Sequence, residues 1–199
     1  MLTKETDFTV FAVTGRMLNK FNNLLNTSRG KSLLANLRNS IGKPLSQTIE
    51  LWPMIFEELP EGFLGKNIHP SKEEKAILAT LQLYAIHQQG MTTCVFKNRG
   101  RELNNIGTSL RRLRTDTDRT AMDRRFNAMI TAATFDELIY HLRHLIRLLK
   151  AKSLETKVNY PQLAHDLYWF LRGYEENLRL SWAREYYRTC KGDEDNDEN

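Results

Sequence analysis

The segment from Ser71 to Gly90 constrains the fold of this chain more strongly than any other stretch of the sequence. Ser71 and Glu74 match a capping box, which begins a helix, and Gly90 suits the position just after a helix end. Between these signals, apolar residues spread around most of the helix circumference: Ala76, Ile77, Leu78, Leu81, Leu83, Tyr84 and Ile86. A helix that is apolar on most sides must be surrounded by other elements, so we expect it to lie at the centre of the N-terminal half.

The rest of the chain also carries apolar residues at helical spacing, and no segment shows the alternation of a strand. Besides the helix that Ser71 begins, helices are predicted over residues 5–26, 29–43, 45–59, 101–114, 120–132, 134–150, 161–172 and 174–189. In the third of these, we expect Ile49, Trp52 and Phe56 to be buried, and Pro53 to kink the helix or delay its start. The predicted fold class is all-α, with about eight to nine helices.

Residues 91–100 interrupt the helical pattern and are the best candidate for a domain boundary. A chain of 199 residues is long enough for one domain or for two small ones. We predict two small helical bundle domains, an N-terminal one at 1–90 and a C-terminal one at 101–190, joined by a linker at 91–100. Residues 191–199 are predicted to be a disordered acidic tail, because the last seven residues hold five acids and no cation.

The cysteines and the apolar segments indicate a compartment. Cys94 and Cys190 lie far apart and form no metal-binding or redox motif, so we expect two reduced thiols. The first residues lack the charged-then-apolar pattern of a secretory signal. No apolar run approaches the roughly 20 residues of a membrane span. We therefore expect a cytoplasmic protein that does not bind a membrane.

Positive charge is concentrated between Lys97 and Arg125. Nine cations and four acids in this stretch leave an excess of five, equal to the formal net charge of +5 of the whole chain. Apolar residues within the stretch keep a helical spacing, so this charge lies on helices that also pack a core. A smaller basic group on the second predicted helix contains Arg29, Lys31, Arg38 and Lys43 and no acid. This distribution favours a polyanion as the partner.

Three consecutive predicted helices place arginines beside their apolar stripe and not within it. In the helix at 134–150, for example, Arg143, Arg147 and Lys150 share a face at i, i+4 and i+7. Phosphates are regularly spaced anions, and arginine binds their oxygens in a bidentate manner. The candidate nucleic-acid-binding residues are Arg38, Lys97, Arg99, Arg101, Arg111, Arg112, Arg114, Arg119, Arg124, Arg125, Arg143 and Arg147. A solvated face and a surface for an acidic protein partner remain alternatives.

No group of residues matches a catalytic or metal-binding pattern. His141 and His144 lack a further ligand at suitable spacing, and His165 with Asp166 lacks a second metal-binding histidine. Neither a glycine-rich phosphate loop nor a nucleophile elbow is present. We expect no enzymatic activity, no metal and no cofactor. The aromatic residues between 160 and 187 could stack bases, but their helical spacing favours a core or a subunit interface.

Five segments carry a resemblance to a known family. They read IGTSLRRL at 106–113, DRRFNAMI at 123–130, HLRHLIRLL at 141–149, YPQLAHDLY at 160–168 and WAREYYR at 182–188. In this order they resemble the CasB family, the small subunit of Cascade, the type I-E CRISPR surveillance complex. The Arg-Arg-Phe at 124–126 is the most specific of these motifs, and the resemblance covers roughly residues 28 to 190.

The resemblance implies a helical, two-domain, non-catalytic protein that assembles as a pair with the other Cascade subunits and the guide RNA. It also implies that the chain holds single strands of target DNA and stabilises the R-loop during antiviral defence. Positions where the family carries basic residues facing nucleic acid are occupied by Arg38, Arg111, Arg112, Arg124, Arg125 and Arg143. Lys97, Arg99 and Arg101 fall in a linker that varies between members and are predicted from charge alone. A helical adaptor that binds an acidic protein through its basic face is the alternative function.

Overall fold

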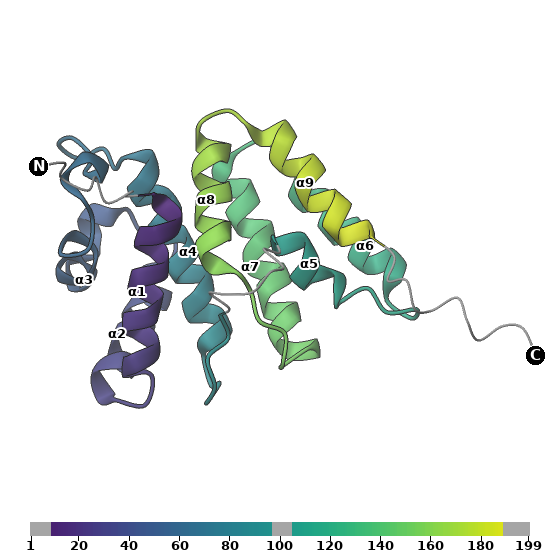
Figure 1. Cartoon of the computed structure of the whole chain (residues 1–199), viewed down its shortest axis with the longest axis horizontal. Helices are drawn as coiled ribbons and strands as arrows, with labels where there is room; N and C mark the ends of the chain where they lie inside the picture. The colour runs from purple at the N-terminus through teal and green to yellow at the C-terminus, as the bar shows by residue number, and fades with distance from the viewer. Residues whose placement is uncertain (1–8, 97–104, 189–199) are drawn as a thin grey trace, which may run out of the picture.

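The computed structural model describes residues 9–96 and 105–188. Within these ranges the backbone forms nine α-helices, three short 3-10 helices and two isolated β-bridges, with no strand. The α-helices are α1 (Val10–Leu24), α2 (Ser28–Asn39), α3 (Trp52–Phe56), α4 (Lys72–Gln88), α5 (Ile106–Arg111), α6 (Arg119–Ile130), α7 (Phe135–Lys152), α8 (Tyr160–Leu171) and α9 (Glu175–Tyr187). Figure 1 shows them in an elongated arrangement, with α1 to α3 at one end and α6 and α9 towards the other. The prediction of an all-α protein is confirmed.

Helix α4 begins and ends where the sequence predicts. The Ser71 Oγ accepts a hydrogen bond from the backbone N–H of Glu74 at 2.9 Å, and the Glu74 carboxylate accepts one from the backbone N–H of Ser71 at 2.7 Å. Thirteen of its 17 residues are buried, because α4 packs against α1, α2, α7 and α8. Gly90 adopts a φ of 76° just after the helix, a conformation that glycine accepts without strain. This helix is the centre of the molecule.

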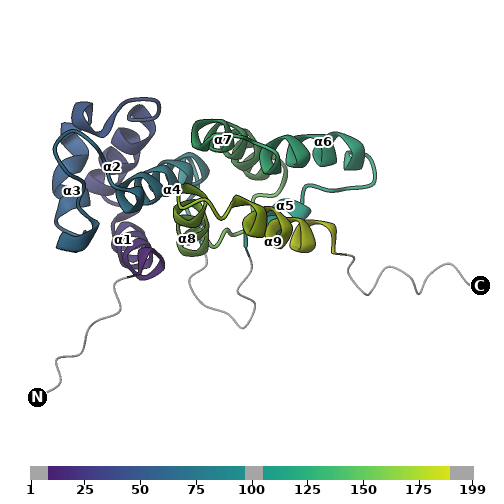
Figure 2. The same ribbon diagram turned by 90° about the horizontal axis from the view of Figure 1, so that it is seen from above.

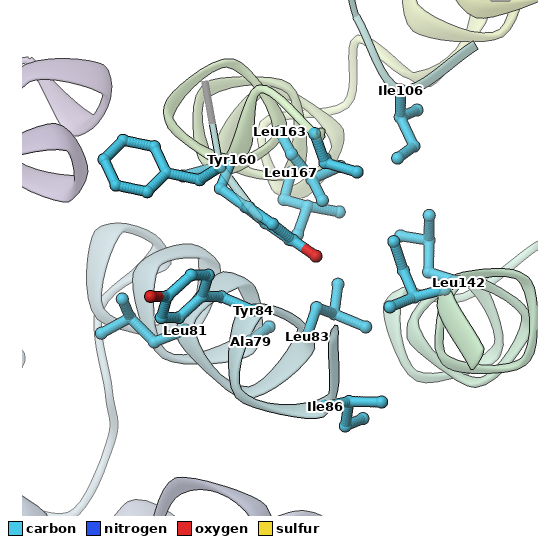
Figure 3. Packing of buried hydrophobic residues seen from close by; sticks show 14 of the residues in the cluster. Ala79, Leu81, Leu83, Tyr84, Ile86, Ile106, Leu142, Tyr160, Leu163 and Leu167 are labelled. Atoms are coloured by element: carbon cyan, nitrogen blue, oxygen red, sulfur yellow. The ribbon is translucent and has the colours of Figure 1, made fainter. Parts of the chain in front are cut away.

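The core around α4 joins segments that are distant in the sequence. Figure 3 shows side chains of α4 facing those of α7 and α8, with Ile106 of α5 beside them. The rings of Tyr84 on α4 and Tyr160 on α8 meet edge to face, with centroids 5.5 Å apart. Because α8 packs against α1 as well as α4, the core is continuous across the two predicted domains. The division into 1–90 and 101–190 stays a prediction.

The third helix differs from its prediction. Residues 45–47 and 49–51 are 3-10 turns, and α3 begins only at Trp52, with Pro53 in its first turn. A delayed start at Pro53 is therefore confirmed. The predicted buried face is wrong: Leu51 and Ile55 are buried, whereas Ile49, Trp52 and Phe56 are exposed. The change from 3-10 to α geometry rotates the side chains between these positions, so a stripe expected for one continuous α-helix does not apply.

The second half follows its predictions more closely. Helix α5 is shorter than the predicted 101–114 helix; Asn105 caps it by accepting from the backbone N–H of Gly107 at 2.9 Å, and residues 101–104 lie outside the described ranges. Thr134 caps α7 as predicted, accepting from the N–H of Glu137 at 3.2 Å. Gly107 lets α9 approach closely, since a Cβ there would lie 2.2 Å from the carbonyl oxygen of Trp182. None of the described helices is long and apolar enough to cross a membrane.

Candidate nucleic-acid interface

Three of the predicted basic residues, Lys97, Arg99 and Arg101, lie outside the described ranges, as do Cys190 and the acidic tail. The other nine lie on or beside α2, α5, α6 and α7. We divide the residues considered for the interface into two groups by the helices that carry them. The first is the α5–α6 surface, which we define as Arg111, Arg112, Arg124, Arg125 and Arg188. The second is the α7 surface, which we define as Arg38, Arg143, Arg147 and Lys150.

Arg114 has a structural role between the two basic helices. Its guanidinium donates two hydrogen bonds to the Asp123 carboxylate, at 2.8 and 3.1 Å, and lies over the ring of Tyr187 at 5.0 Å from the centroid. The bond from Arg114 is the main cause that lowers the pKa of Asp123, and the hydroxyl of Tyr186 adds a second donor at 3.0 Å. These contacts fasten the α5–α6 connection to α6 and α9. The guanidinium of Arg114 is therefore engaged in contacts that stabilise the fold, and we leave Arg114 out of the proposed interface.

An aromatic stack between α6 and α9 defines the buried face of α6, and Arg124 and Arg125 of α6 lie outside this face. Phe126 is fully buried, and its ring lies parallel to that of Tyr186 on α9, with centroids 3.7 Å apart. Arg124 and Arg125, which precede Phe126, are both exposed. Arg125 donates a hydrogen bond of 3.4 Å to the carbonyl of Ala121, within its own helix. Neither arginine forms an ion pair with an acid in the described ranges.

Arg111 and Arg188 of the α5–α6 surface meet where α9 ends. The guanidinium of Arg111 donates to the backbone carbonyl of Arg188 at 3.2 Å, so α5 and the end of α9 share this edge. Arg188 also lies 3.9 Å from the carboxylate of Glu185, a long and exposed ion pair. Arg112 is exposed and forms no ion pair with any described acid. Sequence reasoning missed Arg188, although it lies within the last of the five motifs.

Arg119 differs from its neighbours on the α5–α6 surface. It pairs with Asp116 at 3.1 Å, and both side chains are exposed. Because Arg119 donates a hydrogen bond to its acid, whereas Arg188 lies too far from Glu185 for one, we leave Arg119 out of the proposed interface as well.

The α7 surface joins α2 to α7 through the end of α4. Arg38 donates to the carbonyl of Ala85 at 3.4 Å, and Lys150 donates to the neighbouring carbonyl of Ile86 at 3.4 Å. These carbonyls lie in the last turn of α4, whose partial negative charge attracts cations. Burial lowers the pKa of both side chains, and Arg38 further lowers that of Lys150 because the two positive charges are close.

Lys150 shares its helix with the two other cations of the α7 surface. Arg147 is exposed, and Arg143 is half-buried with its guanidinium 6.0 Å from the ring centroid of Tyr140. Neither arginine pairs with a described acid. The fold thus brings the predicted residue Arg38 next to the helix that carries Arg143 and Arg147, although more than 100 positions separate them in the sequence.

His165 and Asp166, the pair that lacks a second metal-binding histidine in the sequence, form hydrogen bonds with neighbouring side chains. The Asp166 carboxylate accepts from the indole N–H of Trp182 at 2.7 Å and from Gln162 at 2.8 Å. His165 accepts from the indole N–H of Trp169 at 2.9 Å. No cluster of three potential metal ligands occurs in the described part of the chain. These groups stabilise α8 and its packing against α9.

A core position is confirmed for some of the aromatic residues between 160 and 187. Tyr160, Trp182 and Tyr186 are buried, and Trp169 is half-buried. Tyr174 and Tyr187 are exposed.

Comparison with known proteins identifies the family. The family model for CRISPR-associated protein Cse2 matches residues 33–187. The fold is similar to CasB from Thermobifida fusca, with a TM-score of 0.71 and 23% identity over 90% of this chain and 98% of that one.

Two further solved structures share the fold. A Cse2-family protein from Thermus thermophilus has a TM-score of 0.60 and 21% identity, over 87% of this chain and 97% of that one. A chain of a CRISPR RNA-guided surveillance complex has a TM-score of 0.68 and 15% identity, over 90% and 94%. No curated protein matches the sequence significantly. Because the family model spans most of the chain, the protein belongs to the Cse2 family of CRISPR-associated proteins, and the resemblance to the CasB family is confirmed.

Proposed function

We propose that this small subunit contributes sequence-independent DNA contacts to a Cascade-type complex and that its α5–α6 and α7 surfaces make them. The observation that carries the proposal is the outward position of Arg124 and Arg125, which form no ion pair with any described acid. Each unpaired arginine that meets a phosphate releases condensed counterions, and this release dominates affinity that does not depend on sequence. The proposed ligands are single strands of target DNA beside the guide RNA.

A shallow arginine surface is sufficient for this role. Opening a DNA duplex with a guide RNA exchanges one duplex for another of similar stability, so a few backbone contacts can shift the balance towards the R-loop. The guide RNA reads the sequence, and the protein needs only to hold the phosphates. We include in the proposal that the subunit is non-catalytic and acts as a pair of copies within the complex.

The decisive experiment reverses the two outward charges of α6. Arg124→Glu with Arg125→Glu is expected to leave subunit assembly and the thermal midpoint unchanged, since both side chains are exposed. Retention of target DNA by the assembled complex should decrease about 10-fold or more, with a weaker salt dependence. Lys72→Glu with Lys75→Glu is the matched control, because these exposed cations on the first turn of α4 carry the same change of charge.

The result that would overturn the proposal is normal DNA retention by a fully assembled Arg124→Glu, Arg125→Glu complex. An equal loss in the Lys72→Glu, Lys75→Glu control would mean that net charge matters and the α5–α6 surface does not. The alternative function, an adaptor for an acidic protein, predicts partner binding that survives nuclease treatment and is restored when the partner's acids are reversed.

A further inference from the structure

Helix α7 carries aromatic rings on the same exposed face as one of its arginines. Tyr140, His144 and Arg147 follow one another at i, i+4 and i+7, on the side of the helix opposite its buried leucines, and all three are exposed. Tyr140 is 50% exposed, although its ring is large and mostly apolar. We call Tyr140 and His144 together the α7 ring pair.

The two rings of the α7 ring pair contact each other across one turn of the helix. Their centroids lie 4.6 Å apart, with an angle of 66° between the ring planes. His141 also meets the ring of Tyr140 edge to face, at 5.3 Å, and the guanidinium of Arg143 lies 6.0 Å from the same centroid. These neighbours restrict the orientation of the Tyr140 ring, so little side-chain freedom is lost when a flat group packs on it.

The α7 ring pair is open to solvent on the outer side of its helix. Helix α7 packs against α4, α5 and α6 through the opposite side. Figure 2 shows α6 and α7 on one side of the C-terminal half and α9 on the other. A ligand can therefore reach both rings without any change in the packing of the described helices.

The charge around the α7 ring pair is positive. Residues 138–154 contain four cations and no acid. Arg143 and Arg147 lie within this range and form no ion pair with a described acid. The acids of α7 itself, Asp136 and Glu137, lie in its first turn, N-terminal to the ring pair. The exposed face thus suits a ligand that combines negative charge with flat apolar groups.

A single strand of nucleic acid has both of these properties. Its phosphates complement arginine, and each unpaired base offers a face on which an aromatic side chain stacks. In a duplex those faces are covered by the neighbouring base pairs. When a guide RNA opens a target, one DNA strand pairs with the guide and the other is displaced. The displaced strand is therefore the strand whose bases are free to stack.

We propose that the α7 ring pair stacks unpaired bases of the displaced DNA strand, while Arg143 and Arg147 bind the adjoining phosphates. The inference rests on the proposed function, because it requires the α7 surface to contact DNA. It adds contacts to bases, which arginine contacts to phosphates do not provide. Stacking tolerates any base, so it distinguishes a single strand from a duplex without reading the sequence.

The test measures how the assembled complex binds single-stranded DNA. The guide RNA is first paired with a complementary DNA strand, and the probe is a labelled single strand that is complementary to neither. A second probe of the same length is abasic. Tyr140→Ala with His144→Ala should weaken binding of the ordinary strand at least about 10-fold and leave binding of the abasic strand unchanged. The salt dependence should not change, since no phosphate contact is removed.

Two control variants accompany this experiment. Tyr140→Phe with His144→Phe retains two rings and should bind the ordinary strand nearly as well as the wild type. Tyr174→Ala is the matched control, because Tyr174 is 48% exposed but lies between α8 and α9, and it should bind both probes normally. Circular dichroism and thermal midpoints establish that all of these variants fold.

Two results would overturn the proposal. One is wild-type affinity of the Tyr140→Ala, His144→Ala complex for the ordinary strand, and the other is an equal loss of affinity for the ordinary and the abasic strands. If the folded variant instead fails to join the complex, the exposed face of α7 docks a protein subunit, and the proposed ligand is wrong.

The same probes separate this inference from the proposed function. Arg124→Glu with Arg125→Glu removes phosphate contacts and should weaken binding of both probes to the same degree. That loss, together with unchanged binding by Tyr140→Ala with His144→Ala, would refute only the stacking. Normal DNA retention by the arginine variant, together with a base-dependent loss in the ring variant, would refute the contacts proposed for the α5–α6 surface and support stacking on α7.

Discussion

His87 should make the stability of this protein depend on mildly acidic pH. Its side chain is completely buried on α4, where Nδ1 lies 2.9 Å from the hydroxyl of Tyr160. Its Nε2 has no hydrogen-bond partner among the described residues. Burial lowers the pKa of His87 to about 4, and the positive charge of Lys150 contributes in the same direction. The folded protein therefore holds this imidazole neutral.

The direction and size of the effect follow from proton linkage. In the unfolded chain the histidine regains its ordinary pKa of about 6.5, so below that pH the unfolded state binds a proton that the folded state excludes. The free energy of unfolding that His87 contributes is fully present above about pH 6.5 and is lost as the pH falls towards 4. Over the whole range this lowers the free energy of unfolding by about 3 kcal/mol, of which about 2 kcal/mol should be lost between pH 7 and pH 5.

Urea denaturation followed by tryptophan fluorescence measures this loss. The wild type is compared at pH 7 and pH 5 with His87→Gln, which retains a polar group near Tyr160 but does not titrate. The variant should lose about 2 kcal/mol less than the wild type between the two pH values. Asp123 has a lowered pKa, so the stability that its ion pair contributes is lost only below the ordinary aspartate pKa of about 4. It therefore does not contribute to the change between pH 7 and pH 5. An equal loss in wild type and variant would refute the assignment of the effect to His87.

Further outcomes test the packing of α5, α6 and α9. Gly107→Ala should lower the free energy of unfolding by about 1–3 kcal/mol, measured by urea denaturation, because its Cβ would collide with the carbonyl of Trp182. Arg114→Ala should cost about 1–2 kcal/mol by removing the bonds to Asp123, yet leave DNA retention by the assembled complex unchanged. Loss of DNA at unchanged stability would contradict the structural role of Arg114. Asp166→Asn should destabilise the protein by about 1 kcal/mol, since it weakens the bond from Trp182; an unchanged midpoint would contradict this.

Local signals in the sequence predict the helices and the outward position of several arginines. The capping box at Ser71 and the cap at Thr134 operate over three or four residues, so neither depends on the rest of the fold. The delayed start of α3 follows from the ring of Pro53 in the same way. The burial of Phe126 at helical spacing places Arg124 and Arg125 outside the core.

Short segments were predicted least well. Helix α3 contains five residues, little more than one turn, and the preceding residues form 3-10 turns. A periodic pattern needs several turns of one geometry before it defines a face. The prediction therefore placed Trp52 and Phe56 in the core, and their exposure is known only from the structure.

By itself, the sequence determined the helical class, the main caps, the excess of positive charge and the motifs that indicate the family. Only the tertiary structure decided which charges have partners. It pairs Arg114 with Asp123, places Arg38 and Lys150 on adjacent carbonyls of α4, and leaves Arg124 exposed. The physical reason is that an ion pair requires two groups within about 4 Å, and packing between distant helices sets that distance. Helical periodicity determines which side of its own helix a residue occupies, and it carries no information about the residues on the neighbouring helix.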